Sequence, residues 1–167
     1  GRTSTGVRGV KLADGDHVIS MSLLRHVDFE TEERDGYLRL AAARRRAEGA
    51  PGEAPKTAGE TLGAPLEEPP PGEPLSDART AEMAAAEEFI LSVTENGFGK
   101  RSSAYEYRIA NRGGQGIANI DVSARNGQVV ASFPVRGMDQ VMMVTDGGQL
   151  IRIPVEDIRI AGRTTQG

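Results

Sequence analysis

Two stretches of this chain carry the same sequence pattern 51 positions apart. Residues 89–116 align without a gap on residues 140–167, and ten of the 28 aligned pairs are identical. The identities include the turn glycines Gly97 and Gly148 and a shared Arg-Ile-Ala run. A fixed period of about 50 residues is typical of repeat proteins, in which each repeat is one supersecondary unit. The chain is therefore expected to fold as tandem units.

A third copy of the pattern opens the chain. Residues 1–7 resemble residues 111–117, and residues 1–6 resemble residues 162–167 even more closely. The interval from Arg2 to Arg112 is 110 residues, which exceeds the repeat period by 110 − 51 = 59. An inserted segment of that length explains the difference, because its removal restores the period.

The composition changes between residues 28 and 88. Helix formers over residues 37–46 end at Gly49, and a second short helix is predicted over residues 77–88, with Ser76 as its N-cap. Seven of the nine prolines fall between these helices, in residues 51–75. A stretch with so little to bury is predicted to be disordered or extended. We therefore interpret residues 28–88 as an insertion of two marginal helices joined by a flexible linker.

The net charge of −4 conceals two parts of opposite sign. Residues 28–88 hold 15 acidic and 7 basic side chains, a net of 7 − 15 = −8. The other residues hold 13 basic and 9 acidic side chains, a net of 13 − 9 = +4. Local charge decides which ligands a surface attracts, so the repeats are candidates for binding a polyanion.

Short β-branched runs flank glycine-containing turns in the rest of the chain. The predicted hairpins are residues 7–12 and 17–24 around Asp14-Gly15-Asp16, residues 117–122 and 129–133 around Asn126-Gly127, and residues 140–145 and 149–153 around Asp146-Gly147-Gly148. Asn96-Gly97 is the matching turn of the earlier copy, and type I′ turns with two positive φ values are expected. Each period then carries about four short antiparallel strands, which makes an all-β chain of propeller-type blades.

The repeat and the insertion together define the predicted domain organisation. The first blade is residues 1–27 plus 89–111, the insertion is residues 28–88, the second blade is residues 112–162, and residues 163–167 begin the next repeat.

Catalytic and metal-binding patterns are weak in this sequence. Cysteine is absent, which excludes disulfides and thiolate metal sites. His17 and His26 lack a partner pattern for a metal or a catalytic triad, and Asp14 and Asp16 lack the later glutamate of a calcium loop. No run approaches the ~18 apolar residues that cross a bilayer, and no signal peptide opens the chain. We expect a cytoplasmic protein that does not bind membranes, with no catalytic residue, metal or cofactor in this segment.

Basic residues recur at the repeat period and are the strongest functional signal. The candidate DNA-binding residues are Arg2, Arg8, Lys11, Lys100, Arg101, Arg108, Arg112, Arg152, Arg159 and Arg163. Repetition is expected to put equivalent arginines on equivalent faces, as a stripe around a curved surface. Such a stripe suits the phosphates of duplex DNA, which are bound by charge and counterion release without reading base sequence. The alternative is that these are ordinary solvated arginines of a β protein.

Several strings resemble the carboxy-terminal domain of the DNA gyrase A subunit, a type IIA DNA topoisomerase. They are Gly97-Phe98-Gly99-Lys100-Arg101, Asn111 to Ile117, Met142 to Arg152, Gly162 to Gly167 and Gly1 to Ser20, and the resemblance covers about 105 residues. It implies a β-pinwheel, a propeller-like disc whose basic rim wraps DNA. This chain would supply about two blades of a longer protein.

The resemblance also implies a function and partners. The segment itself would be non-catalytic, within a bacterial, nucleoid-associated enzyme that introduces negative supercoils and uses ATP and Mg elsewhere. The implied partners are duplex DNA, the gyrase B subunit, with which an A2B2 heterotetramer forms, and the rest of the gyrase A polypeptide. The signature box Gln-Arg-Arg-Gly-Gly-Lys-Gly is matched only degenerately by residues 110–116, so this copy is expected to belong to a later blade.

Two alternatives remain at the sequence level. The related disc of topoisomerase IV guides DNA, and a propeller-type scaffold would instead bind a protein through the acidic insertion. Two roles are open for residues 28–88: they compete with or repel DNA, or they form an inert solvated loop at a blade edge.

Overall fold

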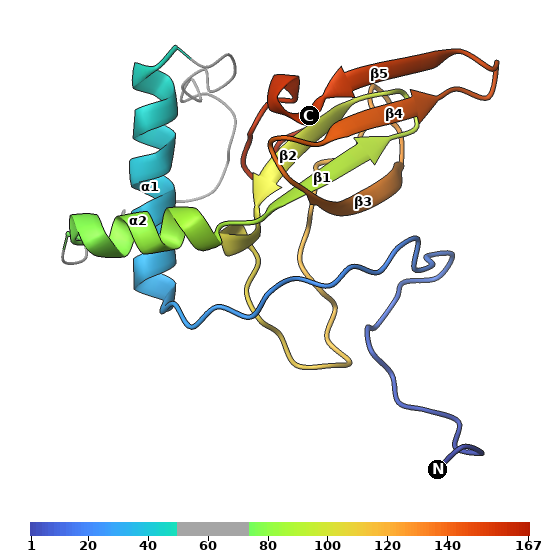
Figure 1. The fold of residues 1–167 in the computed structure, drawn as a ribbon. Helices are drawn as coiled ribbons and strands as arrows, with labels where there is room; N and C mark the ends of the chain where they lie inside the picture. Colours follow the sequence, from blue (N-terminus) through green and yellow to red (C-terminus); the bar gives the residue numbers. More distant parts are fainter. Residues whose placement is uncertain (50–73) are drawn as a thin grey trace, which may run out of the picture.

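The computed structural model describes residues 1–49 and 74–167. The predicted linker of residues 51–75 therefore lies almost wholly outside the described residues. Two β-hairpins stack beside a pair of helices, and the N-terminal segment runs away from both (Figure 1).

The two hairpins are structural copies at the predicted period. β1 (Phe89–Thr94), β2 (Gly99–Ser103) and the 3-10 turn η1 (Ala104–Glu106) make the first copy. β4 (Gln140–Val144), β5 (Leu150–Pro154) and η2 (Val155–Asp157) make the second. The strand pairing obeys the same offset, since Val93 pairs with Gly99 and Val144 with Leu150. The internal repeat is thus a repeat of backbone geometry.

The hairpin turns differ from the predicted type I′ geometry. In the first turn Gly97 has φ 78° and its N–H bonds to the oxygen of Thr94 at 2.9 Å; in the second Gly148 has φ 77° and bonds to Thr145 at 3.0 Å. No residue other than glycine has positive φ in the described parts of the chain. Each is therefore a three-residue loop, in which a turn with negative φ leads into one left-handed glycine.

Strand β3 (Val129–Val135) joins the two predicted blades. It pairs with β1 and not with β4, so that the sheets are β2-β1-β3 and β4-β5. The sheet of the first blade therefore contains a strand from the second, and the described sheets have three and two strands instead of about four. A hydrophobic core of Leu91, Val135, Val141 and Val155 packs between the sheets.

Two further strand predictions are wrong. Residues 1–29 contain no strand, only an isolated bridge between Val10 and Gly114, although Asp14 and Gly15 do form a turn. Residues 117–122 are also irregular. Residues 19–25 correspond to β3 at the 110-residue offset. β3 is a strand because it pairs with β1, which belongs to the repeat before it in the chain. The described residues hold no such preceding hairpin, and an isolated hairpin is only marginally stable.

Both predicted helices are present, and each has a capped start and at least one buried residue. α1 (Thr31–Ala47) starts at a capping box of Glu30 and Glu33, and α2 (Asp77–Ala86) starts at Ser76, whose hydroxyl accepts the N–H of Arg79. Burial anchors them to the first repeat, because Tyr37 and Met83 form a hydrophobic cluster with Tyr105 of η1. The Tyr37 and Tyr105 rings meet edge to face at 5.5 Å. The helical parts of the insertion are therefore packed on the first repeat and do not form a solvated loop.

Candidate nucleic-acid interface

The loop over residues 162–167 folds around the side chain of Lys100. The Lys100 ammonium donates to the carbonyl oxygens of Gly162 at 2.7 Å, Arg163 at 2.8 Å and Thr165 at 3.1 Å. Lys100 is fully buried, and burial lowers its pKa to about 8. The lysine holds the loop over residues 162–167 against β2, and its ammonium group is spent on this internal contact.

Arg101 is likewise committed inside the molecule. Its guanidinium donates to the carbonyl oxygens of Ile158 at 2.7 Å and Glu156 at 3.1 Å, and it lies over the ring of Phe89. Its backbone is also bonded to Arg159 and Ala161. Burial lowers the pKa of Arg101. Lys100 and Arg101 are thus buried and bonded to internal carbonyl groups, which disfavours the predicted contact of these two residues with DNA.

Equivalent arginines do not have equivalent surroundings. Arg152 aligns with Arg101 and lies on β5, but it is exposed. The difference arises because residues 156–161 cover Arg101, whereas the described residues contain no corresponding cover for Arg152. Repetition puts the two arginines at the same register position of their hairpins, but it does not leave both accessible to a ligand.

The other candidates reach the surface. Seven are exposed: Arg2, Arg8, Lys11, Arg108, Arg112, Arg152 and Arg159. Arg163 is half-buried and donates through its guanidinium to the carbonyl oxygen of Ala118. Within residues 1–49 and 74–167, both salt bridges are made by Arg79, with Glu33 and Glu82. The seven exposed cations thus have no carboxylate partner among the described residues.

The basic loops repeat in their backbone contacts as well as in sequence. The N–H of Lys11 bonds to the oxygen of Gly114 at 2.8 Å, and the N–H of Asp121 bonds to that of Thr165 at 3.1 Å. Lys11 and Asp121 are 110 residues apart, and Gly114 and Thr165 are 51 apart, as the two offsets require. Each loop that follows a motif arginine is therefore held by the strand-like segment of the neighbouring copy.

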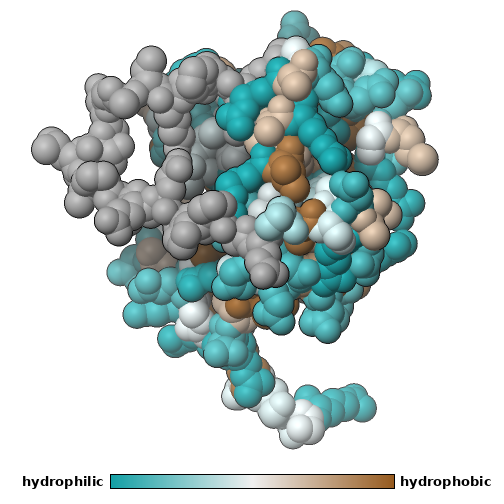
Figure 2. Space-filling model, turned by 90° about the vertical axis from the view of Figure 1, so that its left-hand side faces the viewer, coloured by the Kyte–Doolittle hydropathy of each residue, from teal (hydrophilic) through white to brown (hydrophobic). Residues whose placement is uncertain are grey.

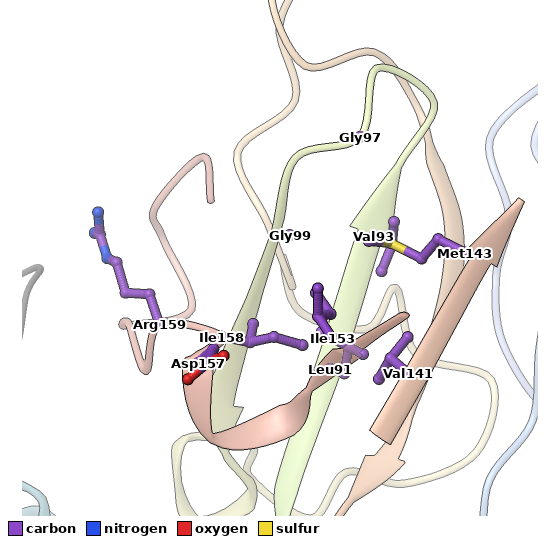
Figure 3. Close-up of a pocket in the computed structure, with 10 residues that line it drawn as sticks. All are labelled: Leu91, Val93, Gly97, Gly99, Val141, Met143, Ile153, Asp157, Ile158 and Arg159. Atoms are coloured by element: carbon purple, nitrogen blue, oxygen red, sulfur yellow. The ribbon is translucent and has the colours of Figure 1, made fainter. Parts of the chain in front are cut away.

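Arg159 borders a cavity without contributing its charge to it. The cavity, about 230 Å³, lies between the hairpins and is lined mainly by apolar side chains such as Leu91, Val141 and Ile153. In Figure 3 the Arg159 side chain points away from these apolar groups. The cavity is a gap in the core between the repeats, and the guanidinium of Arg159 lies on the outside.

Sequence reasoning misses a polar residue that shapes the second basic loop. Asn126 is fully buried; its amide donates to the oxygens of Asp121 at 2.8 Å and Gln166 at 3.0 Å, and it accepts from Ser123. The Asn-Gly pair predicts a hairpin turn at the surface. The partners of Asn126 lie outside that pair, so the sequence of the turn does not indicate that the asparagine is buried.

Other chemistry is not assembled in the described residues. Residues 1–49 and 74–167 contain no cluster of three or more acidic or histidine side chains that could hold a metal ion, and His17 and His26 are exposed. None of the helices over these same residues is both long enough and apolar enough for a bilayer crossing.

The fold and this surface define a class: a tandem-repeat β domain with two inserted helices, whose exposed cations have no carboxylate partner in residues 1–49 and 74–167. Comparison with known families gives a more specific result. The family model of the DNA gyrase C-terminal domain, described as a β-propeller, matches residues 1–25, 88–136 and 139–167. The chain belongs to this family. The unmatched residues 26–87 coincide within two positions at each end with the predicted insertion.

Relatives agree with this membership. The DNA gyrase A subunit of Granulibacter bethesdensis is 56% identical over 169 residues, covering 100% of this chain and 18% of that protein. The Rickettsia conorii counterpart is 49% identical over 168 residues, covering 99% of this chain and 17% of that protein. A crystal structure of the C-terminal domain of DNA topoisomerase IV aligns with 48% of this chain and 25% of its own, at 23% identity and a TM-score of 0.45. The chain spans under a fifth of these two gyrase relatives.

Proposed function

We propose that this chain is part of the DNA-wrapping module of a gyrase A subunit. It binds duplex DNA through surface cations, without reading base sequence, and so supports ATP-dependent negative supercoiling by the whole enzyme. Its partners in that role are the gyrase B subunit, in an A2B2 assembly, and the rest of its own polypeptide, and the chemistry takes place outside this segment. The bacterial nucleoid is the expected location.

One observation carries the proposal. Seven exposed cations, several of them recurring at the repeat period, have no carboxylate partner in the described residues. Phosphate groups are the natural counterions for such a set, since guanidinium groups bind phosphate oxygens in a bidentate way. Their loops contain glycines such as Gly113 and Gly116, both with positive φ, where no side chain blocks approach of a ligand to the backbone.

The test is a salt titration of duplex binding by the full-length protein. Neutralising Arg112, Arg152 and Arg159 together with glutamine is expected to lower the slope of log K against log salt by about 2 to 3, since each phosphate contact contributes about 0.9. ATP-dependent negative supercoiling by the assembled enzyme should fall with it. Arg136→Gln is the matched control, because Arg136 is exposed but lies outside the recurring pattern.

The competing function is a scaffold that binds a protein. It predicts that the triple variant and the parent protein have the same salt slope. An unchanged slope, with supercoiling intact, would contradict the DNA-binding proposal.

A further inference from the structure

The insertion is acidic on average, but α1 divides its charge between its two ends. Its first turns hold Glu32, Glu33 and Asp35, and its last turns hold Arg44, Arg45 and Arg46, with Arg39 one turn earlier. No acidic residue lies between Gly36 and Ala47. We call Arg39, Arg44, Arg45 and Arg46 the basic end of α1.

The basic end is held in place by the anchoring of α1 on the first repeat. Tyr37 is buried against Tyr105, and its hydroxyl donates to Glu87 at 2.7 Å. Tyr105 in turn donates to the carbonyl oxygen of Met83 at 2.8 Å. These contacts fix the middle of α1, and the helix continues from there for ten residues beyond Tyr37. The arginines are therefore presented at a defined position.

The face of α1 that leads to the basic end packs on η1. Ala41 contacts the cluster that contains Tyr105, and Arg45 lies one turn further along the same face of the helix. Glu106, also on η1, accepts the backbone N–H of Arg163 at 2.7 Å. In Figure 1 the C-terminal end of α1 points to the same side as the β4-β5 hairpin. The insertion helix and the loop over residues 162–167 therefore both contact η1.

The arginines of the basic end have no ion pair within the described residues. Both salt bridges there involve Arg79, and none of the four makes a side-chain hydrogen bond to another described residue. Arginines in a last turn do favour the helix dipole, but that effect is confined to the terminal turn and is small at the surface. The part of this face that Figure 2 shows in colour is mainly hydrophilic, with hydrophobic residues in small patches.

We infer that the basic end of α1 is a second phosphate-binding surface for the DNA duplex. It extends the contact from the repeats, whose loop over residues 162–167 also packs on η1, onto the insertion. This inference rests on the proposed function. It also reverses the sequence-based hypothesis that the insertion repels DNA, because the acidic average conceals a basic end.

The test uses the full-length protein and a fluorescent duplex titrated at several salt concentrations. Changing Arg44, Arg45 and Arg46 together to glutamine is expected to lower the salt slope by about 2 to 3 and to weaken binding at low salt by about tenfold or more. The same three positions changed to lysine should keep most of the slope, because the charge remains. Glu32→Gln with Asp35→Asn, at the other end of the same helix, should not weaken binding.

The outcomes separate this inference from the proposed function. If the glutamine variant binds like the parent protein while the Arg112, Arg152 and Arg159 variant loses slope, the basic end does not bind DNA and the proposed function stands. If lysine weakens binding as much as glutamine, the effect is not electrostatic and the inference is overturned. If neither the glutamine variant nor the repeat variant changes the slope, both ideas fail.

Discussion

The β1-β2 and β4-β5 hairpins share one backbone and differ in what covers them. Their strands, turns and 3-10 segments correspond residue for residue at the 51-residue offset. β1, however, has β3 along its second edge, and residues 156–167 pack on β2. The described residues contain no such strand or segment for the second hairpin. Repeated sequence thus specifies the local fold, while the neighbouring copy decides whether an arginine is structural or exposed.

The same comparison explains where the insertion docks. Tyr105 of η1 packs with Tyr37, Met83 and Phe29, whereas the aligned residue of η2 is Glu156, which is exposed. Only the first copy, among the residues that the structure describes, offers an aromatic ring for the helices to cover. The aromatic residue at the middle position of η1, where η2 has Glu156, therefore distinguishes the repeat that carries the insertion.

The largest expected difference between the hairpins is at Lys100 and its counterpart Ile151. Lys100→Met leaves the carbonyl groups of residues 162–165 without their donor and should destabilise the first copy by about 3 kcal/mol. Ile151→Met changes an exposed side chain and should cost under about 0.5 kcal/mol. Hydrogen exchange of the two hairpins in the full-length protein measures both. Equal protection in the two variants would show that the lysine does not hold the loop.

A second difference is expected at the aligned pair Arg101 and Arg152. Arg101→Ala removes two part-buried hydrogen bonds to carbonyl groups and the contact with Phe89, a loss of about 2 kcal/mol. Arg152→Ala should leave stability within about 0.5 kcal/mol but lower the salt slope of DNA binding by about 0.9. Denaturant unfolding and salt titration report the two effects separately. If Arg152→Ala is the more destabilising change, Arg101 is not the structural member of the pair.

The smallest effects test the part that the hairpins share. Gly97→Ala and Gly148→Ala should each cost about 1 kcal/mol, because both positions have positive φ and an added methyl group would contact nothing within 4 Å. Gly137→Ala is the control, since that position also has open space but lacks positive φ. Hydrogen exchange of each turn measures the cost. Clearly unequal costs at Gly97 and Gly148 would mean that the two turns are less alike than their geometry indicates.

Much of the architecture was predictable from the sequence because it is local or repeated. The period, the strands that flank the aligned glycine turns, and the two helices follow from turn residues, β-branched runs and helix caps within a few positions. The strand predictions over residues 7–27 and 117–122 failed because a strand also needs a partner. The pairing of a strand depends on another segment. The sequence of one segment therefore cannot show that its partner is missing from the described residues, or that β3 pairs with β1.

For the candidate site too, some features follow from the sequence and others only from the tertiary structure. The sequence by itself determined that cations recur every 51 residues and that the insertion is acidic on average. Only the tertiary structure decided that Lys100 and Arg101 bond to internal carbonyl groups, that Arg152 is exposed, and that α1 packs on η1 of the first repeat. The physical reason is that a charged side chain is defined by its surroundings: segments from distant parts of the chain supply the acceptors that bury one arginine and leave its copy in water.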